Sequence, residues 1–150
     1  MNKVISMRIC KIGAVTVTYN SANVIDGFLR SLLSQSFSDF VLYLVDNASS
    51  DDTLLRVAKY DDPRITVIAN PGNAGIATGN NQGAKAALAA GCDAVLFINN
   101  DTEFGPALLQ QLADGVEEHQ AEMAAPKIMF FGKEQIIWSA GGGFKSLRGY

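Results

Sequence analysis

The feature that most constrains the fold of this chain is a regular alternation of apolar, strand-like runs with segments whose apolar residues recur at helical spacing. The strand-like runs lie at residues 12–19, 40–46, 64–70 and 94–99. The helical patterns lie at residues 21–35, 49–60, 76–91 and 106–119. Strands and helices that alternate with short connections predict an α/β fold with right-handed crossovers and a mostly parallel sheet. Two further strands are expected, at residues 124–131 and 135–140.

Local signals predict where the helices begin. Ser21 or Asn23 is placed to cap the first helix, and Ser49 with Asp52 has the spacing of a capping box for the second. Pro106 suits the first turn of the fourth helix. The helices are therefore expected to start close to the strand ends that precede them.

Composition predicts one globular domain spanning residues 1–150. Hydrophobic residues make up 48% of the chain and charged residues 18%, a balance typical of a packed core. The formal net charge of −3 argues against binding to nucleic acid. Cys10 and Cys92 show no metal-ligand spacing, and with no secretory segment we expect free thiols and a cytoplasmic location.

Polar residues that follow the strands are the candidates for a site, because ligands of open α/β sheets bind beyond the carboxyl ends of the strands. The first strand runs into "TYNSAN", which lacks the glycines of a dinucleotide-binding loop, and the sequence contains no P-loop pattern. A bound nucleotide diphosphate would therefore need another source of positive charge. A divalent cation held by oxygen ligands is the natural candidate.

Two strand ends offer polar contacts to a ligand. Asp46 ends the second strand, and its carboxylate would bond either to a base or ribose or to loop amides and the next helix; both interpretations stay open. The segment "NPGNAGIATGNNQG" places Asn73 and Gly75 at the mouth of the third connection, where ligand contact is expected. Gly79 and Gly83, inside the following helix, predict a groove for a ligand or another backbone, with packing alone favoured for Gly83.

The segment "NNDTE" is the candidate metal site. Asp101 supplies one charged oxygen there, while Asn99 and Asn100 supply only carbonyl oxygens. One carboxylate suffices for Mg²⁺ when substrate phosphates complete the coordination. The alternative is a polar turn in which Asp101 or Thr102 caps the next helix. His119, the single histidine, is expected at a solvated helix end, so no pairing for nucleophilic catalysis is indicated.

Four motifs, taken in order, resemble the inverting glycosyltransferases of family 2, which have the GT-A fold, and their rhamnosyltransferase-like members above all. They are "AVTVTYNSANVIDGFLRSLLSQSF", "VDNASSDDT", "NPGNAGIATGNNQG" and "LFINNDTEF", within a resemblance that covers residues 12–144. The resemblance implies a Rossmann-like, three-layer α/β/α domain, a UDP- or dTDP-sugar donor, Mg²⁺ or Mn²⁺, and a saccharide or lipid-linked acceptor. It also implies direct displacement, with rhamnose a candidate sugar, in cell-surface polysaccharide synthesis at the cytoplasmic face of the inner membrane.

Carried over residue by residue, the resemblance implies a donor site. Thr18, Tyr19 and Asn20 would border the base, Asp46 would bond to it, and Asp101 would hold the metal in the family's D-x-D position. The other substrate-binding residues that it implies are Asn73, Gly75, Asn81, Asn99 and Asn100.

The chain departs from the family pattern at two places. Asn99 replaces the first aspartate of D-x-D, and no acidic residue follows Glu134. In the family a later carboxylate deprotonates the acceptor, so the catalytic base is expected beyond Tyr150 and the chain is expected to be a truncated, donor-binding portion that lacks activity alone.

The alternative function is a non-catalytic module that binds nucleotide or self-associates as a homodimer. An open sheet edge and an apolar tail favour association; the tail comprises Ile136, Ile137, Trp138 and Phe144. A sugar-phosphate nucleotidyltransferase is disfavoured because the glycine-rich first loop of that class is missing.

Overall fold

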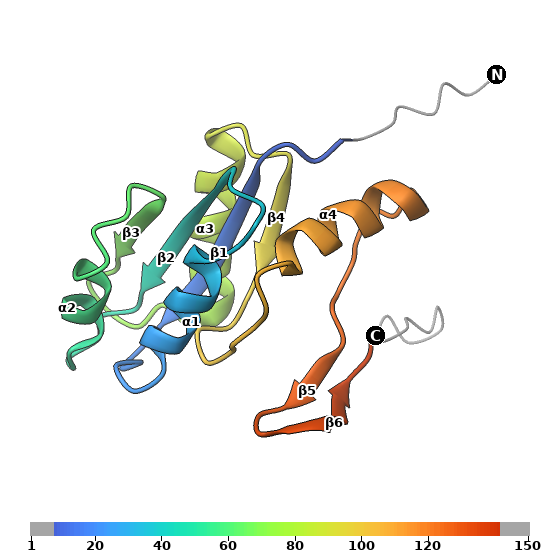
Figure 1. Cartoon of the computed structure of the whole chain (residues 1–150). Coiled ribbons are helices and arrows are strands. Elements are labelled where there is room, and N and C mark those ends of the chain that lie inside the picture. Colours follow the sequence, from blue (N-terminus) through green and yellow to red (C-terminus); the bar gives the residue numbers. More distant parts are fainter. Residues whose placement is uncertain (1–7, 142–150) are drawn as a thin grey trace, which may run out of the picture.

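The computed structural model describes residues 8–141, and Figure 1 shows a parallel sheet with helices on both faces, followed by a β-hairpin. The sheet has the strand order β3-β2-β1-β4. Its strands are β1 (Ile12–Thr18), β2 (Phe40–Asp46), β3 (Ile65–Ala69) and β4 (Ala94–Phe97). The helices are α1 (Ile25–Leu33), α2 (Thr53–Ala58), α3 (Ile76–Ala89) and α4 (Leu108–His119). The predicted α/β class and parallel pairing are confirmed.

Two hydrophobic layers enclose the sheet. On one face α1, α2 and α4 cover alternate residues of β1 and β2, with Phe28, Leu42 and Leu109 fully buried among them. On the other face α3 covers the intervening residues, where Val15 and Cys92 are buried (Figure 1). Because β1 and β2 lie inside both layers, they need apolar side chains on both faces, which explains their unbroken apolar runs. The three-layer α/β/α arrangement is confirmed.

The two cysteines are free thiols, as the sequence predicts. Cys10 is exposed and Cys92 is buried. Burial raises the pKa of the Cys92 thiol above its usual value. Both thiols are free of disulfide bonds within residues 8–141.

The glycines of α3 pack directly against β1. A Cβ atom on Gly79 would lie 2.8 Å from Cγ2 of Val17, and one on Gly83 would lie 3.1 Å from Cγ2 of Val15 and overlap its other methyl group. Both glycines therefore allow a close approach between helix and strand. The groove predicted along these two residues is occupied by the valines of β1, so packing explains Gly79 as well as Gly83.

The starts of α1 and α4 differ from the predictions. The N-cap residue of α1 is Val24 and no side chain caps the helix, so neither Ser21 nor Asn23 has the predicted role. The Ser21 carbonyl instead accepts hydrogen bonds from the N–H groups of Val24 and of Ile25, the first residue of the helix. Helix α4 begins at Leu108, and Pro106 lies in the turn before it.

The predicted capping box of α2 is wrong. Asp52 is the N-cap residue, but its side chain makes no capping hydrogen bond. The Ser49 hydroxyl turns back and donates to Asp46 instead, at 2.5 Å. Ala48, the residue before Ser49, has a φ of 62°, which reverses the chain toward the end of β2.

The two further strands form an antiparallel hairpin of β5 (Ile128–Phe130) and β6 (Lys133–Ser139). Figure 1 shows it projecting away from the sheet beneath α4. Its apolar side chains are largely solvent-accessible: Phe131 is 84% exposed and Trp138 is 63% exposed. Phe144, the last residue of the predicted apolar tail, lies outside the described residues.

The hydropathy of the helices bears on membrane insertion. Within residues 8–141 every helix is too short or too polar to span a bilayer.

Replacing Gly83 by alanine tests the contact between α3 and β1. The added methyl group would overlap the buried Val15 side chain, whose χ1 is restricted, so we expect a loss of about 1–3 kcal/mol in the free energy of unfolding. Gly115→Ala is the matched control, because Gly115 lies within α4 and nothing surrounds its Cβ position. That variant should gain about 0.5–1 kcal/mol. Urea unfolding measures both, and equal effects would contradict the packing argument.

Candidate functional site

The carboxyl ends of the four parallel strands meet at one edge of the sheet. Thr18 at the end of β1 pairs in register with Asp46 at the end of β2, which pairs with Ala69 of β3. After β4 the chain continues beside β1, because Ile98 N–H donates to the Val15 carbonyl at 3.0 Å. The polar segments predicted from the sequence therefore lie along one edge, as expected for a ligand site.

Asp46 is engaged within the protein. It is 1% exposed, and it accepts hydrogen bonds from the Thr18 hydroxyl at 2.8 Å and from the Ser49 N–H at 2.9 Å, besides that from the Ser49 hydroxyl. Both carboxylate oxygens thus accept hydrogen bonds from within the protein, from Thr18 at the end of β1 and from Ser49 in the loop, which corresponds to the second of the two roles considered for this residue. Contact between Asp46 and a base stays a prediction, and it would require one oxygen to be shared.

The residues predicted to border the base differ in what they present. Thr18 is fully buried, whereas Tyr19 is 54% exposed. Asn20 joins two connections: its N–H donates to the Ser49 hydroxyl at 2.9 Å, and its Oδ1 accepts from Ser50 N–H at 2.8 Å. Tyr19 and Asn20 are both exposed, but Asn20 also holds the second connection through Ser50, and Thr18 bonds to Asp46. Of the three, Tyr19 is therefore the residue whose side chain makes no hydrogen bond to another described residue.

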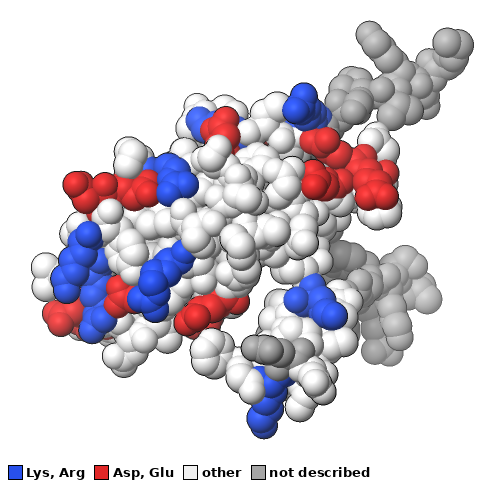
Figure 2. All heavy atoms as spheres, viewed as in Figure 1, with Lys and Arg blue, Asp and Glu red and all other residues white. Residues whose placement is uncertain are grey.

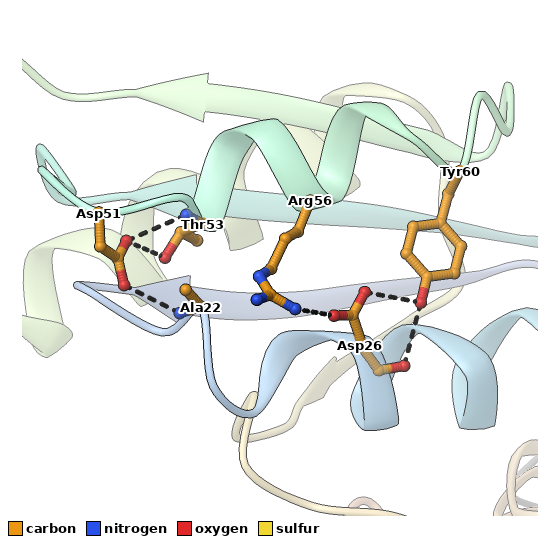
Figure 3. A network of polar contacts seen from close by, with 6 residues as sticks. All are labelled: Ala22, Asp26, Asp51, Thr53, Arg56 and Tyr60. Carbon is orange, nitrogen blue, oxygen red and sulfur yellow. Dashed lines mark hydrogen bonds and ion pairs between the residues drawn. The ribbon is translucent and has the colours of Figure 1, made fainter.

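A second carboxylate, which the sequence did not single out, ties the same two loops together (Figure 3). Asp51 accepts from Ala22 N–H at 3.0 Å and from both the N–H and the hydroxyl of Thr53. The Thr53 hydroxyl is the main reason that the pKa of Asp51 lies below its usual value. Thr53 in turn accepts from Ser21 N–H at 2.8 Å. The sequence signal that could have identified Asp51 is its position, two residues before the first residue of α2.

The helices behind these loops are joined by an ion pair. Arg56 of α2 donates to Asp26 of α1 at 2.6 Å, and the Tyr60 hydroxyl donates to the same carboxylate at 3.1 Å (Figure 3). The hydrogen bond from Arg56 is the largest cause that holds the pKa of Asp26 below its usual value. This contact links the two helices whose N-terminal loops form one half of the edge.

The third connection carries Asn73 and Gly75 at the mouth of α3, and both are exposed. Asn73 Oδ1 accepts from Gly75 N–H at 3.0 Å, and Gly75, with φ 80°, is the N-cap residue of α3. Asn81 is exposed on α3, two residues after the sheet-facing Gly79. Two residues turn an α-helix by roughly 200°, so Asn81 points away from β1.

The fourth connection places Asp101 at the same edge. Asn100 Nδ2 donates to the Val17 carbonyl at 2.5 Å, and the Thr102 hydroxyl donates to the Asn99 carbonyl at 2.7 Å. Asp101 is exposed, and it makes no hydrogen bond to another described residue. The alternative that Asp101 or Thr102 caps α4 is wrong, because Ala107 is the N-cap residue and the Leu109 N–H of the first turn donates to Gln35 Oε1 at 2.9 Å.

The side-chain oxygens at this edge that could coordinate a metal ion form only part of a coordination shell. Within residues 8–141, no group of three or more His, Cys, Asp or Glu side chains could hold a metal ion. Asp101 offers an unengaged carboxylate, and Asn99, two residues earlier and also exposed, offers a neutral side-chain oxygen. Such a set suits a hard divalent cation that takes its other ligands from substrate oxygens and water, and does not suit a closed protein cage.

The distribution of charged side chains can be followed on one face of the molecule in Figure 2. On the face shown in Figure 2, acidic and basic side chains are interspersed around the margin and the centre is largely uncharged. His119 is exposed at the end of α4, as expected. This face therefore shows no continuous basic surface of the kind that binds nucleic acid.

The sequence is similar to known glycosyltransferases. The model of the family described as glycosyl transferase family 2 matches residues 14–147. An uncharacterized glycosyltransferase of Haemophilus influenzae is 29% identical over 105 residues, which are 70% of this chain and 34% of that protein. The poly(ribitol-phosphate) β-N-acetylglucosaminyltransferase TarS of Staphylococcus aureus is 30% identical over 121 residues, 79% of this chain and 21% of TarS.

Solved structures show the same likeness. S. aureus TarS 1–349 in complex with UDP-GlcNAc superposes with a TM-score of 0.65 at 27% identity, over 80% of this chain and 38% of that one. The mannosyltransferase PcManGT from Pyrobaculum calidifontis, in complex with GDP-Man and Mn²⁺, shares the fold with a TM-score of 0.60 at 24% identity, over 77% of this chain and 33% of that one. The chain spans between 21% and 34% of the length of the curated relatives that it matches.

Replacing Asp26 by asparagine tests the ion pair behind the loops. Folding lowers the pKa of Asp26, so its stabilisation is present above the ordinary value of 3.8 and is lost as the pH falls through the lower folded value. We expect a loss of roughly 0.5–1 kcal/mol at pH 7, since the pair is partly solvated, and a smaller difference near pH 2. Asp39→Asn, at an exposed position, is the control. A pH-independent difference in the urea midpoint would contradict the assignment.

Proposed function

The chain belongs to glycosyl transferase family 2, and from that premise we propose that it is the donor-binding portion of an inverting glycosyltransferase of cell-surface polysaccharide synthesis. The donor is a UDP- or dTDP-sugar, with rhamnose a candidate for the transferred sugar, and the acceptor is a saccharide or a lipid-linked saccharide. The enzyme works in the cytoplasm, at the inner face of the membrane. The observation that carries the proposal is the alignment of four polar strand ends at one sheet edge, with Asp101 exposed among them.

Exposed and engaged side chains at this edge suggest how the donor lies. Tyr19 and Asn73 present their side chains to solvent, and Gly75, which has no side chain, leaves room for a ligand. We therefore propose that the nucleoside lies between the first and third connections. Thr18, Asn20 and Asp46 act by holding the loops around it. The diphosphate is placed toward the fourth connection, beside Asp101. Asn81, which points away from the sheet, has the weakest support among the predicted substrate-binding residues.

The residues of the fourth connection would hold the metal. Asp101 would supply the charged ligand and Asn99 a neutral oxygen, while Asn100 keeps the segment against β1 through the Val17 carbonyl. A bound Mg²⁺ or Mn²⁺ supplies positive charge that offsets the charge building up on the departing nucleoside diphosphate. We propose that a carboxylate outside residues 1–150 deprotonates the acceptor. The chain spans 34% and 21% of the length of two curated relatives that it matches.

Titration with UDP and dTDP, with and without Mn²⁺, tests the donor site. We expect at least one nucleotide to bind, more tightly with Mn²⁺, and Asp101→Asn to remove the metal-dependent gain of roughly ten- to a hundredfold, because the cation loses its charged protein ligand. Asp114→Asn removes an exposed carboxylate on α4 and is the matched control. If neither nucleotide binds, or if Asp101→Asn keeps the Mn²⁺ effect, the donor-site assignment is wrong.

Self-association is a second candidate function, favoured by the exposed hairpin. Isolated two-stranded hairpins are marginally stable in water, yet β5 and β6 carry Phe130, Ile136, Ile137 and Trp138 with 46%, 50%, 51% and 63% of their surface exposed. A second copy of the chain would bury these side chains and form a homodimer.

Light scattering across a concentration series tests this association. We expect a dimer or larger assembly that Trp138→Lys weakens, because a charge at the contact would have to be desolvated. Leu55→Lys is the matched control, since Leu55 is 66% exposed, close to the 63% of Trp138, but lies on α2. A monomer at all concentrations would contradict the proposal.

A further inference from the structure

Four amide side chains join the ends of β2 and β3 to α3; we call Asn47, Asn70, Asn73 and Gln82 the amide network. Asn47, the residue after β2, is 2% exposed. Its Oδ1 accepts from Asn70 at 2.9 Å, and its Nδ2 donates to Asn73 Oδ1 at 3.4 Å and to the Gly75 carbonyl at 3.3 Å. Asn70 and Gln82 exchange two hydrogen bonds of 2.9 Å. The carbonyl oxygen and the NH₂ group of the Asn47 amide are therefore both hydrogen-bonded within the protein.

The backbone of Gly75 determines which way these amides point. Its N–H can only donate, so the atom of Asn73 that faces it at 3.0 Å is the oxygen. Its carbonyl can only accept, so Asn47 turns its NH₂ group toward it and its oxygen toward Asn70. Asn70 in turn uses its own oxygen to accept from Gln82. Because amides do not titrate near neutral pH, this orientation does not change with pH.

The orientation leaves Asn73 as a hydrogen-bond donor at the sheet edge. Asn73 is exposed, and its oxygen already accepts from Gly75 and Asn47. Its Nδ2 has no hydrogen-bond partner among the described residues. Gly75 adopts φ 80° and ψ 162°, a conformation that glycine alone adopts readily, so the turn that carries Asn73 is itself well defined. A ligand group that meets Asn73 must therefore be an acceptor.

We propose that Asn47 is a positioning residue of the donor site, which through the amide network holds the Asn73 NH₂ group toward an oxygen of the bound nucleotide. That oxygen belongs either to a carbonyl of the base or to the diphosphate. The inference rests on the proposed nucleotide-sugar function and adds to it the residue that orients Asn73 and the kind of ligand atom that Asn73 contacts.

The Asn73→Asp variant tests the NH₂ group of Asn73 separately from its side-chain oxygen. Aspartate keeps an oxygen for Gly75 N–H and Asn47 Nδ2, but it replaces the outward NH₂ group by a second oxygen. We expect Kd for UDP with Mn²⁺ to rise about tenfold or more, with the unfolding midpoint unchanged. Ala74→Asp adds the same charge on the neighbouring exposed residue and should weaken binding less. Unchanged affinity in Asn73→Asp, or equal losses in the two variants, would overturn the proposal.

A double-mutant cycle tests whether Asn47 acts through Asn73. Asn47→Ala should weaken UDP binding severalfold alone and should have no further effect in an Asn73→Ala background. Additive losses would show a purely structural role for Asn47 and overturn the proposal. Gln82→Leu, at a half-buried helix position, repeats the cycle with a variant less prone to unfold.

Uridine in place of UDP identifies the ligand oxygen. If Asn73→Asp weakens uridine and UDP equally, the oxygen belongs to the base; if it weakens only UDP, the oxygen belongs to the diphosphate, and either result supports the donor role of Asn73. If the unmodified chain binds neither UDP nor dTDP, the proposed function fails together with this inference, and that result is seen before any variant is compared.

Discussion

The close packing of α3 against β1 is the interaction on which the rest of the structure depends. Gly79 and Gly83 let the helix backbone rest on the Val17 and Val15 side chains, and larger residues would push the helix away from the sheet. At this distance the start of α3 reaches the carboxyl edge, where the Gly75 carbonyl lies 3.3 Å from Asn47 Nδ2. Packing on one face of the sheet thus determines the position of polar groups at its edge.

Apart from Asp101, the predicted site residues at this edge are neutral or, like Asp46, already hydrogen-bonded within the protein. Asp46 and Asp51 each accept hydrogen bonds from backbone N–H groups and hydroxyls of the loops, which offset the desolvation of their charges. Among the predicted site residues, Tyr19, Asn20, Asn73, Asn81, Asn99 and Asp101 are exposed, and the Asp101 carboxylate makes no hydrogen bond to another described residue. A ligand with two phosphates would meet no cationic side chain among these residues, so a divalent cation remains the natural source of positive charge.

Sequence reasoning was accurate for the elements and weak for local hydrogen bonds. The Ser49 hydroxyl has an acidic residue three positions away on either side, Asp46 and Asp52, and spacing alone does not choose between them. In the structure the φ of 62° at Ala48 turns the chain so that the Ser49 hydroxyl donates to Asp46. Asn73 and Asn81 are equivalent as polar residues of one motif, and only the rotation of α3 separates them. The β5–β6 hairpin was predicted as two strands, but their antiparallel pairing was not.

By itself the sequence determined the succession of strands and helices along the chain, the parallel character of the sheet and the family. It also determined which polar segments follow the strands. These features depend on local periodicity and on motifs. Only the tertiary structure decided which of those polar side chains hold the fold and which face a ligand. The physical reason is that their partners are distant in the chain: Thr18 bonds to Asp46 across 28 positions, and Asn100 bonds to Val17 across 83. Such pairs form only when sheet register brings the strand ends together.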